Sequence, residues 1–548
     1  MFQIGGQPGH RSEELVFSVR SLISKERAGG KLVILQTSDI SKFFDKEMIE
    51  DALLTCYKRG ADAKACRVWY KLNTNTKIRV KTGAGMSSFC DVGAVVGQGT
   101  LGGALVSQGV LDEGISGKFT PGGEDEMNYG DIPMAPLIFQ DDLLHAAQGI
   151  KEARSANQRM DRVIKQLNLG WNKDKTFCIA IGSKKQLNQV RAELEKEPLM
   201  CGNFETKLKE QFKWLGQILS SGGLAESVAA TVKSREGKIR GACLEIVKIV
   251  NDWRSKIVGG METALMLWEV CCIPSLLHGA GTWTEISSKT EKQVNQCQNW
   301  FLRLILQLGP GTPLPSLLWD TALLDMSIRI KMEKILLVLH LRSLPDNSLA
   351  RKIYEEQKQK NWPGLARETE YICKKMNIPN CNEMDQSKSL YKKIVLEACH
   401  RENEKYLRSQ AKGKFERISH EEYGRKQYIQ SKNISSVRNQ FRTRFGLQFF
   451  AGNYSNDKRF QKSDWLCKCE KSREEESHLL SGQCTVYGDL TLKYSDLTSD
   501  DNLVGLFTEI LARRDELDKV ITPVGGGITN VGANPGPETG ISQSRDNI

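Results

Sequence analysis

The first 225 residues alternate short apolar runs with longer amphipathic ones. Short runs of β-branched and other apolar residues predict β-strands, and apolar residues three or four positions apart predict α-helices. The predicted strands are residues 31–36, 136–139 and 176–181, with a strand pair over 210–220 and a hairpin over 68–81. The predicted helices are residues 13–26, 46–57, 101–111 and 153–169. This alternation indicates an α+β fold.

Beyond about residue 226 the pattern becomes helical and contains few strand signals. The clearest predicted helices are residues 264–272, 288–308 and 328–341. After Leu517 the chain is rich in Gly, Pro, Asn and Ser, which leaves too little apolar surface to offset the entropy of ordering. We therefore expect a mostly α-helical region after the α+β part, and a disordered tail over residues 518–548.

The composition is that of a globular protein with several folding units. Of the 548 residues, 40% are hydrophobic and 26% are charged, which excludes an intrinsically disordered chain. No apolar stretch reaches the length of a membrane span, and the first ten residues lack the apolar segment of a signal peptide. We expect an intracellular protein, in the nucleus or the cytoplasm, without a membrane partner. The sequence does not indicate its oligomeric state.

The charge favours contact with a polyanion. The formal net charge is +11, and residues 401–462 contain 15 Lys or Arg against 6 Asp or Glu. Aromatic residues, among them Tyr423, Tyr428 and Phe441, are interleaved with these charges. Such a segment can contact phosphates and stack on unpaired bases. The alternative, which the sequence leaves equally open, is that these rings belong to a helical core.

Three carboxylates stand at the ends of predicted strands. Asp39 follows the strand over residues 31–36, and Asp141 and Asp142 lie on a predicted turn after residues 136–139. Transfer of a nucleotidyl group uses two cations about 3.5–4 Å apart, and Mg²⁺ prefers oxygen ligands. These acids can supply such ligands, although an Asp-Asp doublet in a loop is more often a solvated turn.

Five short segments in order resemble the palm motifs of reverse transcriptases. They are residues 39–45 (Asp-Ile-Ser-Lys-Phe-Phe-Asp), 97–99 (Gly-Gln-Gly), 139–142 (Phe-Gln-Asp-Asp), 169–176 (Leu-Gly-Trp-Asn-Lys-Asp-Lys-Thr) and 212–216 (Phe-Lys-Trp-Leu-Gly). In particular the chain resembles the LINE-like retrotransposons that lack long terminal repeats. The resemblance implies a right-hand polymerase palm, which is an antiparallel sheet with packed helices, followed by a mostly helical thumb and C-terminal region.

The resemblance also implies roles for individual residues. Asp39, Asp141 and Asp142 would be the ligands of two Mg²⁺ ions. Phe44 would be the steric gate. The nucleotide-binding residues would be Gln98, Gly99 and Lys175, of which Lys175 would reach the triphosphate. The primer grip would comprise Trp214, Leu215 and Gly216.

The chain departs from the family pattern at several places. Gln140 stands where the family usually has Ala or Met, and the turn after Gly99 lacks the usual Pro and Ser. Because the first motif comes early, we expect an N-terminally truncated chain that lacks most of the fingers. The expected regions are partial fingers and palm (1–225), a thumb-like helical domain (226–360), a basic helical connector (361–460) and a Cys/His motif (461–490).

The Cys/His motif has the ligand types of a structural zinc site. Cys467, Cys469, His478 and Cys484 offer three thiolates and one imidazole, which suits tetrahedral zinc. The alternative is ordinary buried thiols beside a solvated histidine, since the chain has 15 cysteines without regular spacing. Zinc here would brace the preceding basic segment.

Taken together, these features predict an RNA-directed DNA polymerase. Its partners would be an RNA template, a DNA primer or target, and dNTPs. The alternative is an inactive, truncated nucleic-acid-binding protein derived from such an enzyme, although the intact carboxylate trio favours the enzyme. An RNA-dependent RNA polymerase is a third possibility, against which the bulky Phe44 argues.

Overall fold

The computed structural model describes residues 4–5, 7, 9–41, 43, 49–74, 76–83, 85–92, 109–111, 127–134, 136–251, 260–309, 312, 314–379, 387–411, 421–431, 434–444, 467–471, 476–494 and 500–521. The chain divides into two compact units, Met1–Arg438 and Asn439–Ile548. The first unit has a mixed α+β structure, as expected. In this described part, no helix is both long and apolar enough to cross a membrane.

A five-stranded sheet forms the centre of the α+β part. Its strand order is β13-β10-β1-β9-β8, and all neighbours are antiparallel except β10 and β13. The strands are β1 (Val33–Asp39), β8 (Leu137–Phe139), β9 (Asp142–Ala147), β10 (Phe177–Ile181) and β13 (Lys207–Leu208). The strands predicted over residues 31–36, 136–139 and 176–181 are therefore present, and both acid-bearing strands lie in the same sheet.

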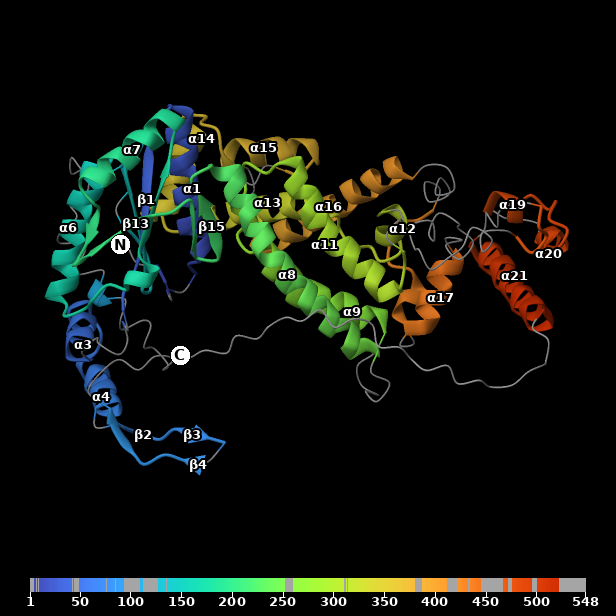
Figure 1. The fold of residues 1–548 in the computed structure, drawn as a ribbon, viewed down its shortest axis with the longest axis horizontal. Helices are drawn as coiled ribbons and strands as arrows, with labels where there is room; N and C mark the ends of the chain where they lie inside the picture. The colour runs from blue at the N-terminus through green and yellow to red at the C-terminus, as the bar shows by residue number, and fades with distance from the viewer. Residues whose placement is uncertain are drawn as a thin grey trace. The chain divides into compact units, whose positions relative to one another are not determined.

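Helices cover both faces of this sheet, because successive side chains of β1 point to opposite sides. Val33 and Leu35 belong to the core shared with α1 (Ser12–Ala28), which packs against α14 (Leu349–Gln359). Ile34 instead belongs to the core below α6 (Ile150–Gln166) and α7 (Lys184–Lys196). In Figure 1, α6 lies on one side of β1, and α1 and α14 lie on the other.

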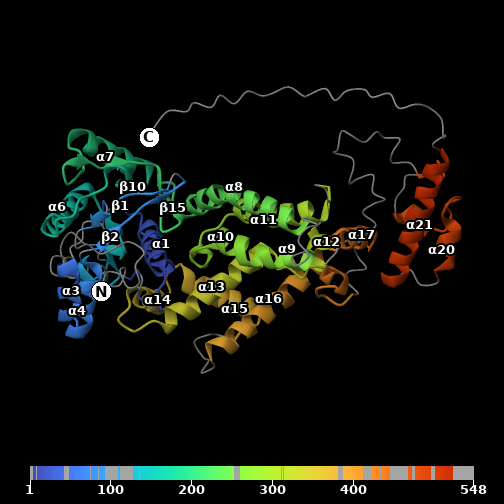
Figure 2. The ribbon, with the colours of Figure 1, turned by 90° about the horizontal axis from the view of Figure 1, so that it is seen from below.

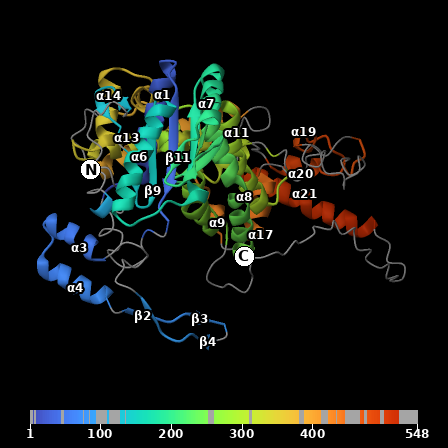
Figure 3. The same ribbon diagram turned by 60° about the vertical axis from the view of Figure 1, so that its left-hand side comes forward.

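Short hairpins and two helices extend from the sheet. The hairpin strands are β2 (Thr76–Ile78) with β5 (Cys90–Val92), β3 (Lys81–Thr82) with β4 (Gly85–Met86), β6 (Asn128–Tyr129) with β7 (Ile132–Pro133), β11 (Met200–Cys201) with β12 (Phe204–Glu205), and β14 (Gln211–Trp214) with β15 (Gln217–Ser220). Figure 3 shows α3 (Ile49–Lys58), α4 (Ala63–Asn73) and the β2–β4 strands as one extension.

The predicted hairpin over residues 68–81 is wrong in its first half. Helix α4 runs to Asn73, and a strand begins only at Thr76. The helix is started by Asp62, whose carboxylate accepts hydrogen bonds from the backbone N–H groups of Lys64 and Ala65. This N-cap favours a helix over the weak alternation that predicted strands.

The helical part continues the same core and is not separated from the sheet. Its helices are α8 (Leu224–Asn251), α9 (Met261–Leu267), α10 (Ile273–Leu277), α11 (Ser288–Leu306), α12 (Leu314–Trp319), α13 (Met326–Ser343), α15 (Leu365–Lys375) and α16 (Lys388–Gln410), with a π-helical turn at Trp268–Cys272. Figure 2 shows them extending from the sheet. Arg20 of α1 donates hydrogen bonds to the carbonyls of Leu224 and Thr282. This buried contact joins the α+β part to the helices that follow it.

Two described aromatic side chains of the basic segment pack inside the first unit. The Tyr423 hydroxyl accepts a hydrogen bond from Asn403, and its ring lies 5.3 Å from that of Trp319. Tyr428 donates a hydrogen bond to Asp320. These rings therefore follow the helical-core alternative and not base stacking. The segment also contains a 3-10 turn (Gln427–Gln430) and α17 (Ile434–Arg444).

The second unit contains a small core of its own. Its helices include α19 (Glu476–Leu480), α20 (Gly488–Lys493) and α21 (Asp500–Ile521). Leu479, Tyr487 and Phe507 are fully buried between them. Because α21 continues to Ile521, the first four residues of the predicted disordered tail are helical. The rest of that tail lies outside the described residues.

Candidate active site and candidate metal centre

The acids of two sheet strands meet at one edge of the sheet. Asp39, the last residue of β1, lies directly opposite Asp142, the first residue of β9. Directly opposed residues of antiparallel strands point to the same face, so the two carboxylates are neighbours. The turn between β8 and β9 consists of Gln140 and Asp141, because Phe139 pairs with Asp142. Asp141 is therefore held beside the same strand end.

The backbone of this turn is unusual at Gln140, whose φ is +60°. A positive φ at the first central position belongs to a type II′ hairpin turn, where glycine is normally found. A residue other than glycine in such a conformation carries strain that the surrounding structure must maintain. The tight two-residue turn keeps Asp141 and Asp142 at a defined place.

Asn172 and Lys175, which follow α6 in the chain, hold the carboxylate of Asp39 in place. Asn172 donates from its backbone N–H to the Asp39 carbonyl (2.9 Å) and from Nδ2 to Asp39 Oδ2 (2.9 Å). Lys175 Nζ lies 3.2 Å from Asp39 Oδ1. Both residues belong to a tight turn, because Asn172 Oδ1 accepts a hydrogen bond from the backbone N–H of Asp174. Asn172 was part of the sequence motif, but this contact was not predicted.

The clustered carboxylates perturb one another. Burial raises the pKa of Asp142 to about 6, and the charges of Asp141 and Asp39 add to this effect. Burial, with the charge of Asp39, also raises the pKa of Asp141. A bound cation stabilises the ionised forms of Asp141 and Asp142, which burial and the neighbouring carboxylates disfavour. The donor set, carboxylate oxygens at a strand edge, fits Mg²⁺.

A cavity of about 380 Å³ opens over Asp39 and Asp142. Three lysines, Lys175, Lys209 and Lys213, line it together with Asp39 and Asp142. Lys209 and Lys213 were not predicted as site residues. The sequence did carry a signal for Lys213, because polar and apolar residues alternate from Gln211 to Trp214 and place Lys213 on the polar face. Anionic phosphates would meet this lysine cluster when they approach the acids.

The predicted primer-grip residues form a hairpin turn. Leu215 and Gly216 have φ values of +44° and +76° and join the paired residues Trp214 and Gln217, as in a type I′ turn. Arg235 of α8 donates a hydrogen bond of 2.6 Å to the Gly216 carbonyl. The hairpin is thus anchored to the first long helix after the sheet.

The ring of Trp214 does not face the cavity. Trp214 is only 2% exposed and belongs to the main core, so its ring is not available to a nucleic acid. Its exposed neighbours on β14 are Gln211 and Lys213, which line the cavity. Alternation along the strand causes this, because Trp214 occupies an inward position. The predicted gate Phe44 and the nucleotide-binding Gln98 and Gly99 lie outside the described residues.

The second unit brings the predicted zinc ligands together. One ligand atom from each of Cys467, Cys469, His478 and Cys484 lies within 4.8 Å of all the others. The Cys467 and Cys484 sulfurs are 3.6 Å apart, and Cys469 Sγ lies 3.3 Å from His478 Nε2. Sulfurs bound tetrahedrally at about 2.3 Å from one zinc ion would lie about 3.8 Å apart. The cluster therefore has the composition and dimensions to hold a metal ion such as zinc.

No family model matches the chain, and no curated protein matches it. Solved structures of telomerase are similar to it. One from Candida tropicalis, in complex with the TWJ fragment of telomeric RNA, is 10% identical with a TM-score of 0.31, covering 65% of this chain and 53% of that chain. Apo telomerase from Candida tropicalis is 12% identical with a TM-score of 0.31, covering 72% and 57%.

Telomerase from Candida albicans, in complex with the TWJ fragment of telomeric RNA, is also similar. It is 12% identical with a TM-score of 0.30, and the match covers 71% of this chain and 53% of that chain. The chain thus spans little more than half the length of the telomerase chains that it matches.

Proposed function

We propose that the chain is an RNA-directed DNA polymerase, the reverse transcriptase of a LINE-like retrotransposon, which adds nucleotides from dNTPs to a primer 3′-hydroxyl. The observation that carries this proposal is the opposition of Asp39 and Asp142 on paired strands beneath a lysine-lined cavity. Nucleotidyl transfer requires converging carboxylates and positive charge near a triphosphate, and this site contains both.

The carboxylates and lysines have separate tasks in this mechanism. Asp39, Asp141 and Asp142 would hold two Mg²⁺ ions, which supply Lewis acidity for the attacking hydroxyl and the leaving pyrophosphate. Lys209 and Lys213 attract the phosphates into the cavity. The ammonium group of Lys175 pairs with Asp39 while its side chain is 64% exposed, so it can turn from that carboxylate to a phosphate oxygen.

Orientation of Asp39 comes from the turn after α6. Asn172 holds both the backbone and one carboxylate oxygen of Asp39, which leaves the other oxygen to Lys175. A ligand held in one rotamer avoids reorganisation during catalysis. On this proposal Phe44 excludes the ribonucleotide 2′-hydroxyl, and Gln98 and Gly99 contact the incoming nucleotide and template, as the resemblance implies.

The second unit contributes a structural zinc site on the same proposal. Zinc bound by Cys467, Cys469, His478 and Cys484 would cross-link the loop before α19 to the segment before α20. A core as small as that around Phe507 gains stability from such a closed site. The partners of the whole enzyme would be an RNA template and a DNA primer or target, in the nucleus or the cytoplasm.

Primer extension by the purified full-length chain tests the proposal. An RNA template with an annealed DNA primer is incubated with dNTPs and Mg²⁺, and the products are resolved by length. We expect extension by the wild type and a loss of about 1000-fold or more in Asp142→Asn, because removal of a metal ligand costs several kcal/mol of transition-state stabilisation. The control Asp131→Asn changes an exposed turn acid and should extend as the wild type does.

Two outcomes would contradict the proposal. Binding of the hybrid without extension by the wild type would favour the inactive nucleic-acid-binding alternative. Extension with NTPs in preference to dNTPs would favour an RNA polymerase.

A further inference from the structure

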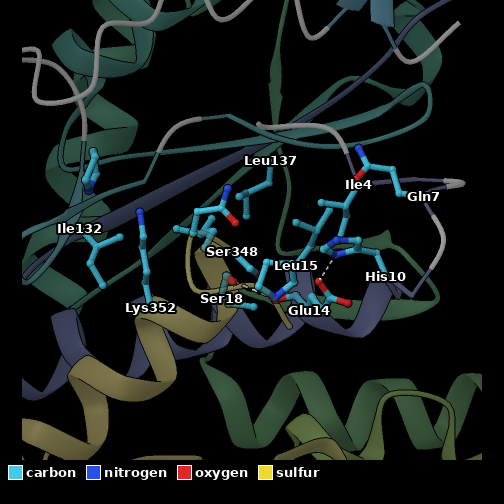
Figure 4. A pocket seen from close by; sticks show the side chains of 15 residues that line it. Ile4, Gln7, His10, Glu14, Leu15, Ser18, Ile132, Leu137, Ser348 and Lys352 are labelled. Atoms are coloured by element: carbon cyan, nitrogen blue, oxygen red, sulfur yellow. Dashed lines mark hydrogen bonds and ion pairs between the residues drawn. The ribbon is translucent and has the colours of Figure 1, made fainter. Parts of the chain in front are cut away.

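A second cavity lies between α1, β8 and the start of α14 and is separate from the acids. Its volume is about 530 Å³, and none of its lining residues lines the cavity over Asp39. Figure 4 shows its walls, which come from α1, the strands β7 and β8, and the start of α14. The side chains of Leu15, Ile132 and Leu137 make much of this wall apolar. We call it the α1–α14 cavity.

One end of the α1–α14 cavity is lined by the carboxylate of Glu14, which hydrogen bonds hold in place. The Glu14 carboxylate accepts hydrogen bonds of 2.8 Å from the backbone N–H of Arg11 and from ring nitrogens of His10 and His340. Burial raises the pKa of Glu14, but the hydrogen bonds from His340 and His10 outweigh it and lower the pKa below its ordinary value. These contacts satisfy Glu14 and hold the ring of His10 at the cavity wall.

The other end carries a positive charge. Lys352 of α14 lines the cavity and is exposed, and among the described residues it has no ion-pair partner. Ser348 precedes α14 and also lines the cavity, and its hydroxyl makes no capping hydrogen bond to the helix. In Figure 4 the Lys352 side chain extends from α14 beside the apolar wall, and Ser348 lies just before the start of that helix. A cation and a hydroxyl donor next to apolar surface are complementary to an organic anion.

The wall of the cavity is directly linked to the acid-bearing turn. Leu137 lines the cavity from β8, and the strand ends two residues later at the turn that contains Gln140. The backbone N–H of Ile4 donates to the carbonyl of Ile138 along the same strand. At Gly5 an added Cβ would lie 2.6 Å from the backbone nitrogen of Gln140, so the segment packs tightly on the turn. A ligand that contacts β8 can therefore shift the turn that positions Asp141.

We propose that the α1–α14 cavity binds an apolar organic anion. Pockets of about 300–1,000 Å³ with apolar walls and a few placed polar groups take drug-sized ligands. The apolar body would lie against Leu15 and Leu137, and the carboxylate or sulfonate would meet Lys352 and Ser348. Under the proposed polymerase function, on which this second step rests, occupancy changes the rate of nucleotide addition through β8.

Binding is measured with anilinonaphthalene sulfonate, an aromatic monoanion whose fluorescence rises in apolar sites. We expect saturable binding at one site of the full-length protein. Lys352→Glu should weaken this binding at least about fivefold, which is about 1 kcal/mol. Ser348→Trp should abolish it by filling the cavity. The matched control Lys358→Glu changes another exposed lysine of α14 that does not line the cavity, and it should bind as the wild type does.

Two results would overturn the binding proposal. One is the absence of a saturable rise in probe fluorescence, which would be the result if another segment of the chain filled the cavity. The other is equal weakening by Lys352→Glu and Lys358→Glu, which would indicate a general charge effect. The link to the acids is tested by primer extension with and without saturating probe. The probe should change the extension rate of the wild type and leave that of Ser348→Trp unchanged. If the wild type extends no primer, the polymerase proposal fails while the fluorescence titration still decides the cavity.

Discussion

Replacing Asn172 with alanine should slow nucleotide addition without preventing substrate binding. The Asn172 amide donates a 2.9 Å hydrogen bond to a carboxylate oxygen of Asp39, whose side chain is only 8% exposed. A hydrogen bond to a charged group contributes about 1.5–3 kcal/mol, which corresponds to about 10- to 150-fold in rate. Because the bond orients a metal ligand, the loss should fall mainly on kcat and on the Mg²⁺ concentration for half-maximal rate, with little change in KM for dNTP.

Single-nucleotide addition over a Mg²⁺ titration measures this effect. Asn188→Ala, a change on an exposed face of α7, is the matched control and should leave every parameter unchanged. Asn172→Asp should be more damaging than Asn172→Ala, since it places a fourth carboxylate against Asp39. The reasoning is refuted if Asn172→Ala raises KM alone, or if it is as active as Asn188→Ala at limiting Mg²⁺.

Further predictions concern stability, metal and sugar selection. Burial and the charge of Arg159 lower the pKa of His145 from 6.5 to about 4, so between these pH values the unfolded chain binds a proton that the folded chain does not. The unfolding free energy of the wild type should thus fall by about 3 kcal/mol more than that of His145→Leu as pH drops from 7.5 to 4, measured by urea titration. Metal analysis should find one zinc per chain in the wild type and in Cys90→Ser, but not in Cys484→Ser; equal content in all three would remove the cluster from zinc binding. Phe44→Ala should raise ribonucleotide incorporation, and an active variant that still discriminates as the wild type does would exclude Phe44 as the gate.

The strands and acids were predictable because they depend on local pattern. A β-branched run followed by Asp39, and an apolar run followed by Asp141 and Asp142, define strand ends from the sequence alone, and the structure places Asp39 opposite Asp142. The strand pair predicted over residues 210–220 is likewise present as β14 and β15. The resemblance placed Trp214 in the primer grip, and the structure adds that its ring is buried in the core.

Other features depend on contacts between distant residues and could not be predicted. Glu14 and His340 are 326 positions apart, and neither lies in a recognisable motif. In the sequence, Tyr423 is an aromatic residue among basic ones. Only its ring contact with Trp319 and its hydrogen bond from Asn403 show that it belongs to a core. The hairpin predicted over residues 68–81 was wrong for a different reason. The N-cap Asp62 favours helix α4 more strongly than the weak alternation favours strands.

The most direct test of the proposed active site is to locate Mn²⁺ by anomalous X-ray scattering in crystals of the protein with a primer–template and a non-hydrolysable dNTP. A two-metal site predicts two peaks about 3.5–4 Å apart, both within coordination distance of carboxylate oxygens of Asp39 and Asp142. Peaks at other acids, or no peak between these two strands while the nucleotide is bound, would contradict the assignment of these carboxylates to catalysis.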